Sequence, residues 1–351
     1  MASLTETAYY TRRAINWGIL AIVGYVVLRF MWGIFVILWL TVFPPKAPPP
    51  NHAFNVIPKL VFPPQATPSG QLTFQLETIT GRLPGASESA AVYFMPKAAP
   101  NLLALTKTQQ MASRLGFDPT PIAESKNIYR FNDTDFPLRR LRYDIVSNNF
   151  VLRYAFERDP GLFVEKNLPT IESAKMEAMN MLQNYELYNE DLAGGTDAIT
   201  YLRLVSDQLV PTTSLSQSDA VRIDFFRMPV GTTPVYTPYP DEAPVSIILS
   251  GAATNQKKRV LQFAYTFWPI DYQTTATYEL KTPDTAWQEL QSGQGYIARY
   301  PKSGSTALVR NLTIGYYDSF EPQTYLQPIF VFEGDDGFLG YVPAVSATWT
   351  Q

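Results

Sequence analysis

Residues 14–43 read AINWGILAIVGYVVLRFMWGIFVILWLTVF, and this apolar stretch decides how the rest of the chain is organised. An α-helix rises about 1.5 Å per residue and the hydrocarbon core of a bilayer is about 30 Å thick, so about 20 apolar residues suffice to cross it. The stretch exceeds that length, and it is also longer than the apolar region of a cleaved signal peptide. We therefore predict an uncleaved transmembrane signal anchor in a lipid bilayer at residues 14–43.

The charges beside the anchor predict its orientation. Arg12 and Arg13 precede the apolar stretch, whereas only Lys46 lies close behind it. Lys and Arg are enriched on the cytoplasmic side of membrane spans. We therefore expect residues 1–13 to be a cytoplasmic N-terminus and the large C-terminal part to be extracytoplasmic, in a single-pass protein of the cell membrane.

Arg29 lies inside the apolar stretch, where a cation is energetically costly. Two interpretations remain open. Either Arg29 pairs with an acidic side chain on a partner's transmembrane helix, or the span begins near residue 22 and the side chain snorkels to the cytoplasmic face. The second is favoured, and the first makes Arg29 a candidate partner contact.

A proline-rich segment follows the anchor. Nine prolines fall between Pro44 and Pro68, a density that favours an extended polyproline II conformation. We predict a semi-rigid tether at residues 44–69. His52, the only histidine of the chain, lies in this segment, and we expect it to be exposed to solvent and without a function.

Composition excludes several kinds of chemistry. The chain has no cysteine and one histidine, so it cannot assemble a Cys-based zinc site or a Ser-His-Asp or Cys-His catalytic group by itself. Residues 51–351 carry 24 basic and 30 acidic side chains, and this acidic balance argues against nucleic acid as a partner. We predict no catalytic residue, no cofactor and no metal site.

Short capped helices alternate with apolar and aromatic strands in the remainder. Helices are predicted at residues 106–115, with a capping box formed by Thr106 and Gln109, at 170–188, and at 282–290. Strands are predicted at 72–76, 91–95, 149–156, 220–227, 245–249 and 259–267, with a closing hairpin of 325–333 and 337–345. This pattern predicts an α+β, mainly antiparallel, two-lobed domain. Its lobes are expected at residues 70–167 and 168–351.

Four phrases near the C-terminus suggest a family. They are Trp287-Gln-Glu-Leu-Gln-Ser-Gly, Leu312-Thr-Ile-Gly-Tyr-Tyr, Tyr325-Leu-Gln-Pro-Ile-Phe-Val-Phe and Gly340-Tyr-Val-Pro-Ala-Val. With the anchor, this order of helix, tyrosine-bearing strand and terminal hairpin resembles the YycH/YycI type of membrane-anchored extracytoplasmic regulator. The resemblance implies a non-enzymatic protein that acts on a membrane partner such as a sensor kinase. The long proline-rich segment departs from that pattern.

Carboxylates are the remaining candidates for catalysis, because glycosidases need only two acids. The candidates are Asp271, Glu279, Asp318, Glu321, Glu333, Asp335 and Asp336. Asp335-Asp336 is followed by Gly337 between two strands, which is typical of a turn. The acidic clusters at residues 132–135 and 189–197 lack the ligand spacing of a calcium loop.

Exposed tyrosines supply rigid contact area for a partner. Tyr236, Tyr239, Tyr316 and Tyr317 lie in or near predicted loops and are candidate partner contacts, although anchoring in the core or in a loop is the favoured interpretation. The function predicted from these observations is a non-catalytic, membrane-tethered interaction or regulatory module of a bacterial cell envelope, with a membrane or envelope protein as partner. The alternatives are an envelope hydrolase that acts on glycans through paired carboxylates, and a structural component of an envelope assembly.

Overall fold

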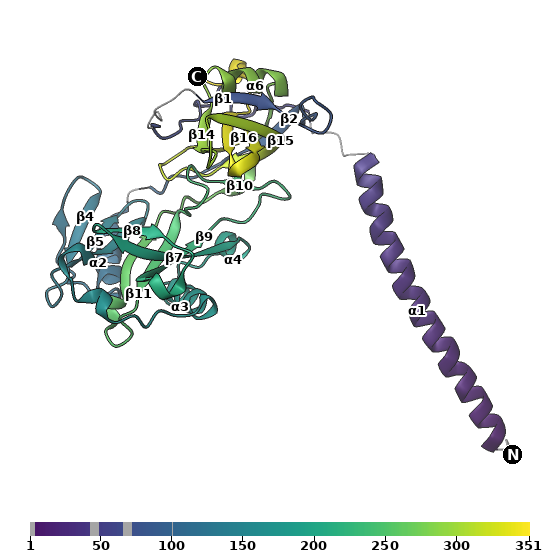
Figure 1. Cartoon of the computed structure of the whole chain (residues 1–351), viewed down its shortest axis with the longest axis horizontal. Coiled ribbons are helices and arrows are strands. Elements are labelled where there is room, and N and C mark those ends of the chain that lie inside the picture. Colours follow the sequence, from purple (N-terminus) through teal and green to yellow (C-terminus); the bar gives the residue numbers. More distant parts are fainter. Residues whose placement is uncertain (1–3, 43–48, 66–71, 100) are drawn as a thin grey trace. The chain divides into compact units, whose positions relative to one another are not determined.

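A computed structural model describes residues 4–42, 49–65, 72–99 and 101–351 of the chain (Figure 1). The chain divides into two compact units, Met1–Pro48 and Pro49–Gln351.

The first unit is dominated by helix α1 (Leu4–Val42), a single helix of 39 residues. Its part Arg12–Val36 is long and apolar enough to cross a membrane. The helix begins ten residues before the predicted anchor, so the polar residues ahead of the apolar stretch are helical as well. Arg29 lies in this helix with an exposed side chain, and its pairing with a partner stays a prediction.

The described part of the second unit contains two sheets. The eight-stranded sheet has the order β1-β15-β16-β17-β14, with β10 beside β15, and with β2 beside β16 and β13. Its strands are β1 (Thr73–Leu76), β2 (Ser89–Phe94), β10 (Val235–Tyr236), β13 (Asp271–Glu279), β14 (Tyr296–Arg299), β15 (Thr306–Tyr317), β16 (Tyr325–Gly334) and β17 (Leu339–Pro343). β1 and β10 pair with β15 in parallel, and the other neighbours are antiparallel.

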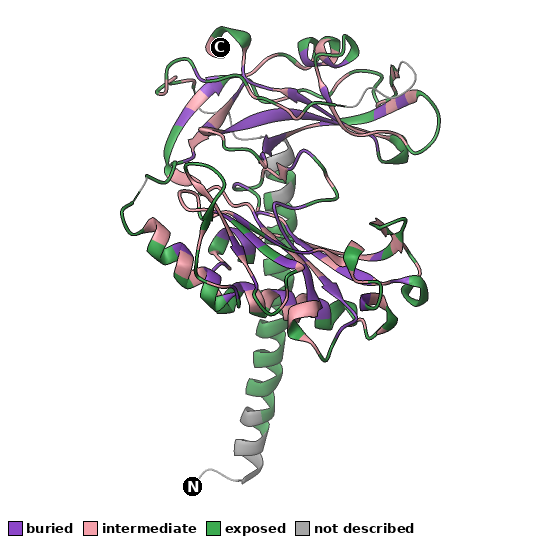
Figure 2. Cartoon of the chain, turned by 90° about the vertical axis from the view of Figure 1, so that its left-hand side faces the viewer, coloured by how far each residue is buried: buried purple, intermediate pink, exposed green. Residues whose placement is uncertain are grey.

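The nine-stranded sheet is antiparallel throughout, in the order β3-β4-β5-β6-β12-β11-β9-β7-β8. Its strands are β3 (Ile122–Ala123), β4 (Ile128–Asn132), β5 (Arg139–Asp144), β6 (Phe150–Tyr154), β7 (Asp197–Val205), β8 (Gln208–Pro211), β9 (Ala220–Phe225), β11 (Val245–Ser250) and β12 (Val260–Tyr265). Figure 2 shows buried residues running along the strands of both sheets.

Helices cover one side of each sheet. They are α2 (Ala104–Arg114), α3 (Ile171–Asn184), α4 (Glu190–Ala193), α5 (Gln256–Arg259) and α6 (Pro283–Gln291), with 3₁₀ turns η1 (Phe156–Arg158), η2 (Leu162–Val164), η3 (Leu215–Gln217), η4 (Asp335–Gly337) and η5 (Ala347–Trp349). α2 and α3 bury apolar side chains, such as Ala112 and Leu182, in one cluster with Leu152 and Phe263 of the nine-stranded sheet. α6 buries Leu290 against the eight-stranded sheet.

The predicted α+β class with mainly antiparallel strands is confirmed, whereas sheet membership differs from the predicted lobes. β1 and β2 lie in one sheet with β13 to β17, and β6 pairs with β12, so that Leu152 lies opposite Phe263. Both sheets therefore draw strands from either side of the expected boundary between residues 167 and 168. Such pairings between distant segments depend on tertiary contacts and have no local signal.

Local capping explains which helix predictions hold. The Thr282 side chain accepts a hydrogen bond from the Thr285 N–H, and α6 starts with Pro283 as expected. Thr170 caps α3 in the same way, but Glu186, with φ of 60°, ends the helical stretch before residue 188. The capping box at Thr106 is wrong, because α2 already starts at Ala104.

The two sheets are joined by a buried ion cluster. Arg227 follows β9, and its Nε donates to Oδ2 of Asp318, which follows β15, at 3.1 Å. Its Nη1 donates to Asp191 of α4, and its Nη2 to the carbonyl of Trp268 at 2.6 Å. Tyr272 of β13 donates its hydroxyl proton to the same Asp191 at 2.9 Å. The Arg227 guanidinium and its hydrogen-bonded partners thus connect elements of both sheets.

Candidate functional site

Residues 51–65, which we call the entry segment, lie against the domain. The N–H groups of Asn51 and His52 donate to the carbonyl of Thr277, and Ile57 pairs with Thr350 in a parallel bridge. Ile57 is fully buried. The prediction of a free tether therefore does not hold for these residues, because apolar side chains among the prolines find places in the core; residues 44–48 and 66–69 lie outside the described residues.

His52 is not the solvent-exposed residue that we expected. Its ring stacks on Trp349, with 3.7 Å between the ring centroids, and meets Tyr278 edge-on. The residue is half-buried and has a positive φ of 47°. His52 thus helps to fix the start of the entry segment to the domain.

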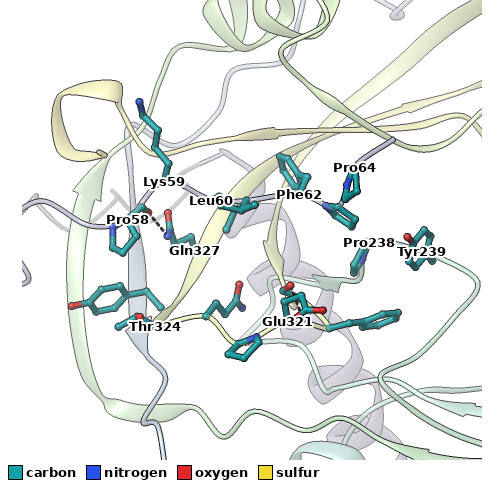
Figure 3. A pocket seen from close by; sticks show the side chains of 17 residues that line it. Pro58, Lys59, Leu60, Phe62, Pro64, Pro238, Tyr239, Glu321, Thr324 and Gln327 are labelled. Atoms are coloured by element: carbon teal, nitrogen blue, oxygen red, sulfur yellow. Dashed lines mark hydrogen bonds between the residues drawn. The ribbon is translucent and has the colours of Figure 1, made fainter. Parts of the chain in front are cut away.

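The entry segment forms one wall of a cavity of about 440 Å³, which we call the proline–aromatic cavity. Residues 58–64 form this wall, and the others come from Pro238 with Tyr239 and from residues 319–325 with Gln327. Figure 3 shows Pro64 near Tyr239 at one end and Pro58 with Thr324 at the other. Most of the lining is apolar, as is typical of ligand pockets.

Hydrogen bonds and ring contacts hold the walls in place. Gln327 of β16 donates from Nε2 to the carbonyl of Pro58 at 2.9 Å. Phe62 stacks on Tyr296 of β14 with 5.0 Å between centroids. On the opposite wall, the Tyr239 and Phe320 rings lie 5.8 Å apart. The cavity is therefore preformed by contacts between segments far apart in the sequence.

Local turn chemistry positions Tyr239. The Thr237 hydroxyl donates to the carbonyls of Tyr239 and Glu242, at 2.7 and 3.0 Å, which closes the turn after β10. Tyr239 keeps 44% of its surface exposed. Among the four tyrosines predicted as partner contacts, it is the one that lines the cavity.

The other three tyrosines are anchored inside the domain. Tyr316 and Tyr317 lie in β15 and are buried, and burial raises the pKa of both phenols. Their burial agrees with the favoured interpretation of anchoring in the core, because β15 is an inner strand of the sheet. Tyr236 is half-buried and donates to Glu333 at 3.4 Å. Its ring lies over Gly315, where a Cβ would come within 2.5 Å of the ring carbons.

Two of the seven acidic candidates, Asp318 and Asp335, are paired with arginines. Asp318 belongs to the ion cluster of Arg227, and Asp335 accepts two hydrogen bonds from Arg310. Asp336 has a left-handed φ of 54°, which fits the predicted turn. In the acidic stretch at 132–135, Asp133 is paired with Arg139 and Lys257. In the stretch at 189–197, Asp191 binds the Arg227 cation and Asp197 binds Lys175.

The proline–aromatic cavity itself contains little charge. Lys59 and Glu321 are its charged lining residues within the described part of the chain. Tyr239 was predicted as a contact residue from its sequence, but no local pattern indicated that the entry segment and residues 319–325 line one cavity with it. The apolar residues Ile57, Leu60 and Phe62 between prolines were the available signal for a packed segment.

Comparisons with known proteins leave the family open. No protein-family model matches the chain, and no curated protein gives a significant match. Among solved structures, the chain is similar to an uncharacterized protein from Eubacterium rectale ATCC 33656 whose crystal structure was determined at 1.45 Å resolution. The match has a TM-score of 0.40 and 13% identity, and it covers 77% of this chain and 86% of that one. At this level the similarity carries no argument about function.

Proposed function

We propose that the chain is a non-catalytic, membrane-tethered interaction module that binds an extended, apolar segment of a membrane or envelope protein in the proline–aromatic cavity. Helix α1 supplies the membrane anchor, and the domain lies on the extracytoplasmic side. The observation that carries the proposal is the cavity itself, with its preformed apolar walls and the exposed Tyr239.

An extended occupant is favoured by the cavity's own wall. Residues 58–64 contain three prolines, pack Leu60 and Phe62 against the eight-stranded sheet, and are held by the bond from Gln327 to the Pro58 carbonyl. This surface therefore already accommodates one proline-containing segment. Aromatic side chains opposite it, Tyr239 and Phe320, offer the type of surface that receives proline-rich peptides in other recognition domains.

The alternative of a hydrolase with paired carboxylates receives less support. A glycosidase needs two carboxyl groups about 5 to 9.5 Å apart. Among the described residues, the proline–aromatic cavity presents Glu321 alone. A smaller neighbouring cavity presents Glu321 and Asp144, but Asp144 Oδ1 accepts hydrogen bonds from the N–H groups of Val146 and Ser147 and stabilises a turn.

The resemblance to YycH/YycI-type regulators suggests a sensor kinase as the partner. This extension of the proposal rests on the resemblance alone. The orientation has a separate test. A periplasmic-type reporter fused after Gln351 should be active, because Arg12 and Arg13 favour a cytoplasmic N-terminus. Reporter activity confined to the cytoplasm would overturn the extracytoplasmic placement.

Site-directed photocrosslinking in native membranes tests the binding site. A photoreactive phenylalanine at position 239 should give a discrete adduct, whereas the same residue at position 164 should not. Val164 is a matched control because 82% of its surface is exposed and it lies outside the cavity. Equal labelling from both positions, or no adduct from position 239, would contradict the proposal.

A further inference from the structure

A second concavity lies on the nine-stranded sheet. It has a volume of about 630 Å³ and is lined by five arginines. We call this concavity the arginine groove. The arginines are Arg130, Arg140, Arg142, Arg153 and Arg158. Glu124 and Glu157 are the acidic lining residues in the described chain, so the groove has a local surplus of positive charge in a domain whose overall balance is acidic.

The alternation of strand residues creates this groove. In β5 the residues 139, 141 and 143 are buried, which leaves Arg140 and Arg142 on the outer face. The register places Arg142 opposite Arg130 of β4, and Arg140 opposite Arg153 of β6. Like charges directly opposite each other across a strand pair are destabilising. Stability of the sheet therefore does not account for four arginines at these positions.

Some of these charges have internal partners and others do not. Glu124 binds Arg142 Nε at 3.0 Å, and Glu157 binds Arg153. Within the described residues, no carboxylate forms an ion pair with Arg140 or Arg158, and both side chains are exposed. The internal pairs show that guanidinium groups in this groove bind carboxylates, and Arg140 and Arg158 remain available to bind carboxylates of another molecule.

The arginine groove continues toward the proline–aromatic cavity. A third, smaller cavity shares Arg142 and Val151 with the groove, and it shares residues 320–322 with the proline–aromatic cavity. The three concavities therefore adjoin in series. The middle one presents Asp144 and Glu321 beside Trp268, so it repels further acidic groups and suits neutral, apolar ones.

We propose that the arginine groove binds a run of Asp and Glu residues in the partner, next to the apolar segment that occupies the proline–aromatic cavity. The proposal rests on the proposed function, because it names the chemistry of the same kind of partner. Arginine forks bind carboxylates in a bidentate manner, and an acidic peptide supplies several of them in succession. A polypeptide also combines acidic and apolar side chains in one chain, as the order of the three concavities requires.

The test measures binding of a fluorescent deca-glutamate peptide to the full chain in detergent micelles by anisotropy. The double variant Arg140→Gln and Arg158→Gln should weaken binding about tenfold or more, because it removes the two guanidinium groups of the groove that have no internal carboxylate partner. Replacing both by Lys should give an intermediate affinity, because the charge remains and the planar fork is lost. The matched control is Arg82→Gln with Lys302→Gln, two exposed cations outside the groove.

The outcomes separate this inference from the proposed function. The control pair should bind like the wild type, and affinity should fall with rising ionic strength. No binding of the peptide, or equal loss in the control pair, would overturn the inference, as would binding of inorganic polyphosphate but not of deca-glutamate. Tyr239→Ser should leave the affinity for deca-glutamate unchanged, because Tyr239 lies outside the arginine groove. The crosslinking experiment and the anisotropy experiment can therefore fail independently of each other.

Discussion

Removal of the Arg227 guanidinium should destabilise the domain more than removal of the guanidinium of an exposed arginine. Arg227 is only 7% exposed, and its guanidinium lies 4.5 Å from the centroid of the Phe267 ring. Burial works to lower the pKa of Arg227, but Asp318 and Asp191 outweigh it and raise the pKa above its usual value. The ionised form is therefore the form that the folded domain stabilises.

The magnitude follows from what Arg227→Ala leaves behind. Asp318 has 3% exposure and Asp191 has 9%, so two carboxylates would stay buried without their cation. Breaking a buried pair by removing one partner costs about 3–5 kcal/mol. Oδ1 of Asp318 already has no hydrogen-bond partner among the described residues, which leaves little local compensation.

Urea unfolding of the full chain in detergent, followed by tryptophan fluorescence, measures the effect. We expect Arg227→Ala to lower the free energy of unfolding by about 3–5 kcal/mol. Arg310→Ala is the control, since Arg310 forms its ion pairs at the surface and should change stability little. Arg227→Met combined with Asp191→Asn and Asp318→Asn should recover most of the loss, because no unpaired charge remains.

The result that would refute this reasoning is a loss for Arg227→Ala as small as that for Arg310→Ala. The triple variant provides a second check. If it were as unstable as Arg227→Ala, the loss would come from packing against Phe267 and not from uncompensated charge.

Three further predictions concern other parts of the domain. Ile57→Ala should cost about 2–5 kcal/mol in unfolding free energy, whereas Val61→Ala, at an exposed position, should cost little; equal effects would restore the free-tether interpretation. Burial works to raise the pKa of Asp133, but hydrogen bonds from Lys257 and Arg139 outweigh it and hold the pKa below its usual value. The stabilisation is therefore present above that usual value and is lost as the pH falls through the lowered pKa. Asp133→Asn should accordingly flatten the decline of Tm below about pH 4, and an unchanged decline would contradict this. At Asp336, with its left-handed backbone, Asn should leave Tm unchanged and Val should cost about 1–2 kcal/mol; equal Tm values for the two would show that the turn is not constrained.

The parts of the fold that could be predicted are those with local causes. Thr282 and Pro283 define the start of α6 through a side-chain cap and a fixed φ, both encoded within a few residues. The pairing of β6 with β12 joins segments about a hundred residues apart, and no neighbouring residue signals it. The density of prolines predicted a tether, but it did not indicate that Ile57 is buried in the domain.

The candidate site follows the same division. Tyr239 was identified because it lies in a turn rich in proline, where exposure is common. Tyr316 and Tyr317 have the same side chain but lie in an inner strand, and only the sheet order distinguishes them. The arginine groove depends on the register of β4, β5 and β6, so the alternation in β5 alone was insufficient to indicate it.

The docking of the entry segment has a mechanical consequence. Lys59 N–H donates to the Gln351 carbonyl at 3.0 Å, and Gln351 N–H donates to the Ile57 carbonyl at 3.1 Å, so the segment runs beside the last residues in parallel. A pulling force transmitted along the chain from α1 reaches the domain at the entry segment. There it acts as shear on the hydrogen bonds to Gln351, so these bonds bear the force simultaneously. Force spectroscopy with handles on α1 and on the arginine groove would measure the rupture force, which Ile57→Ala should reduce. Because residues 58–64 also form a wall of the proline–aromatic cavity, a pull that detaches them also dismantles that cavity.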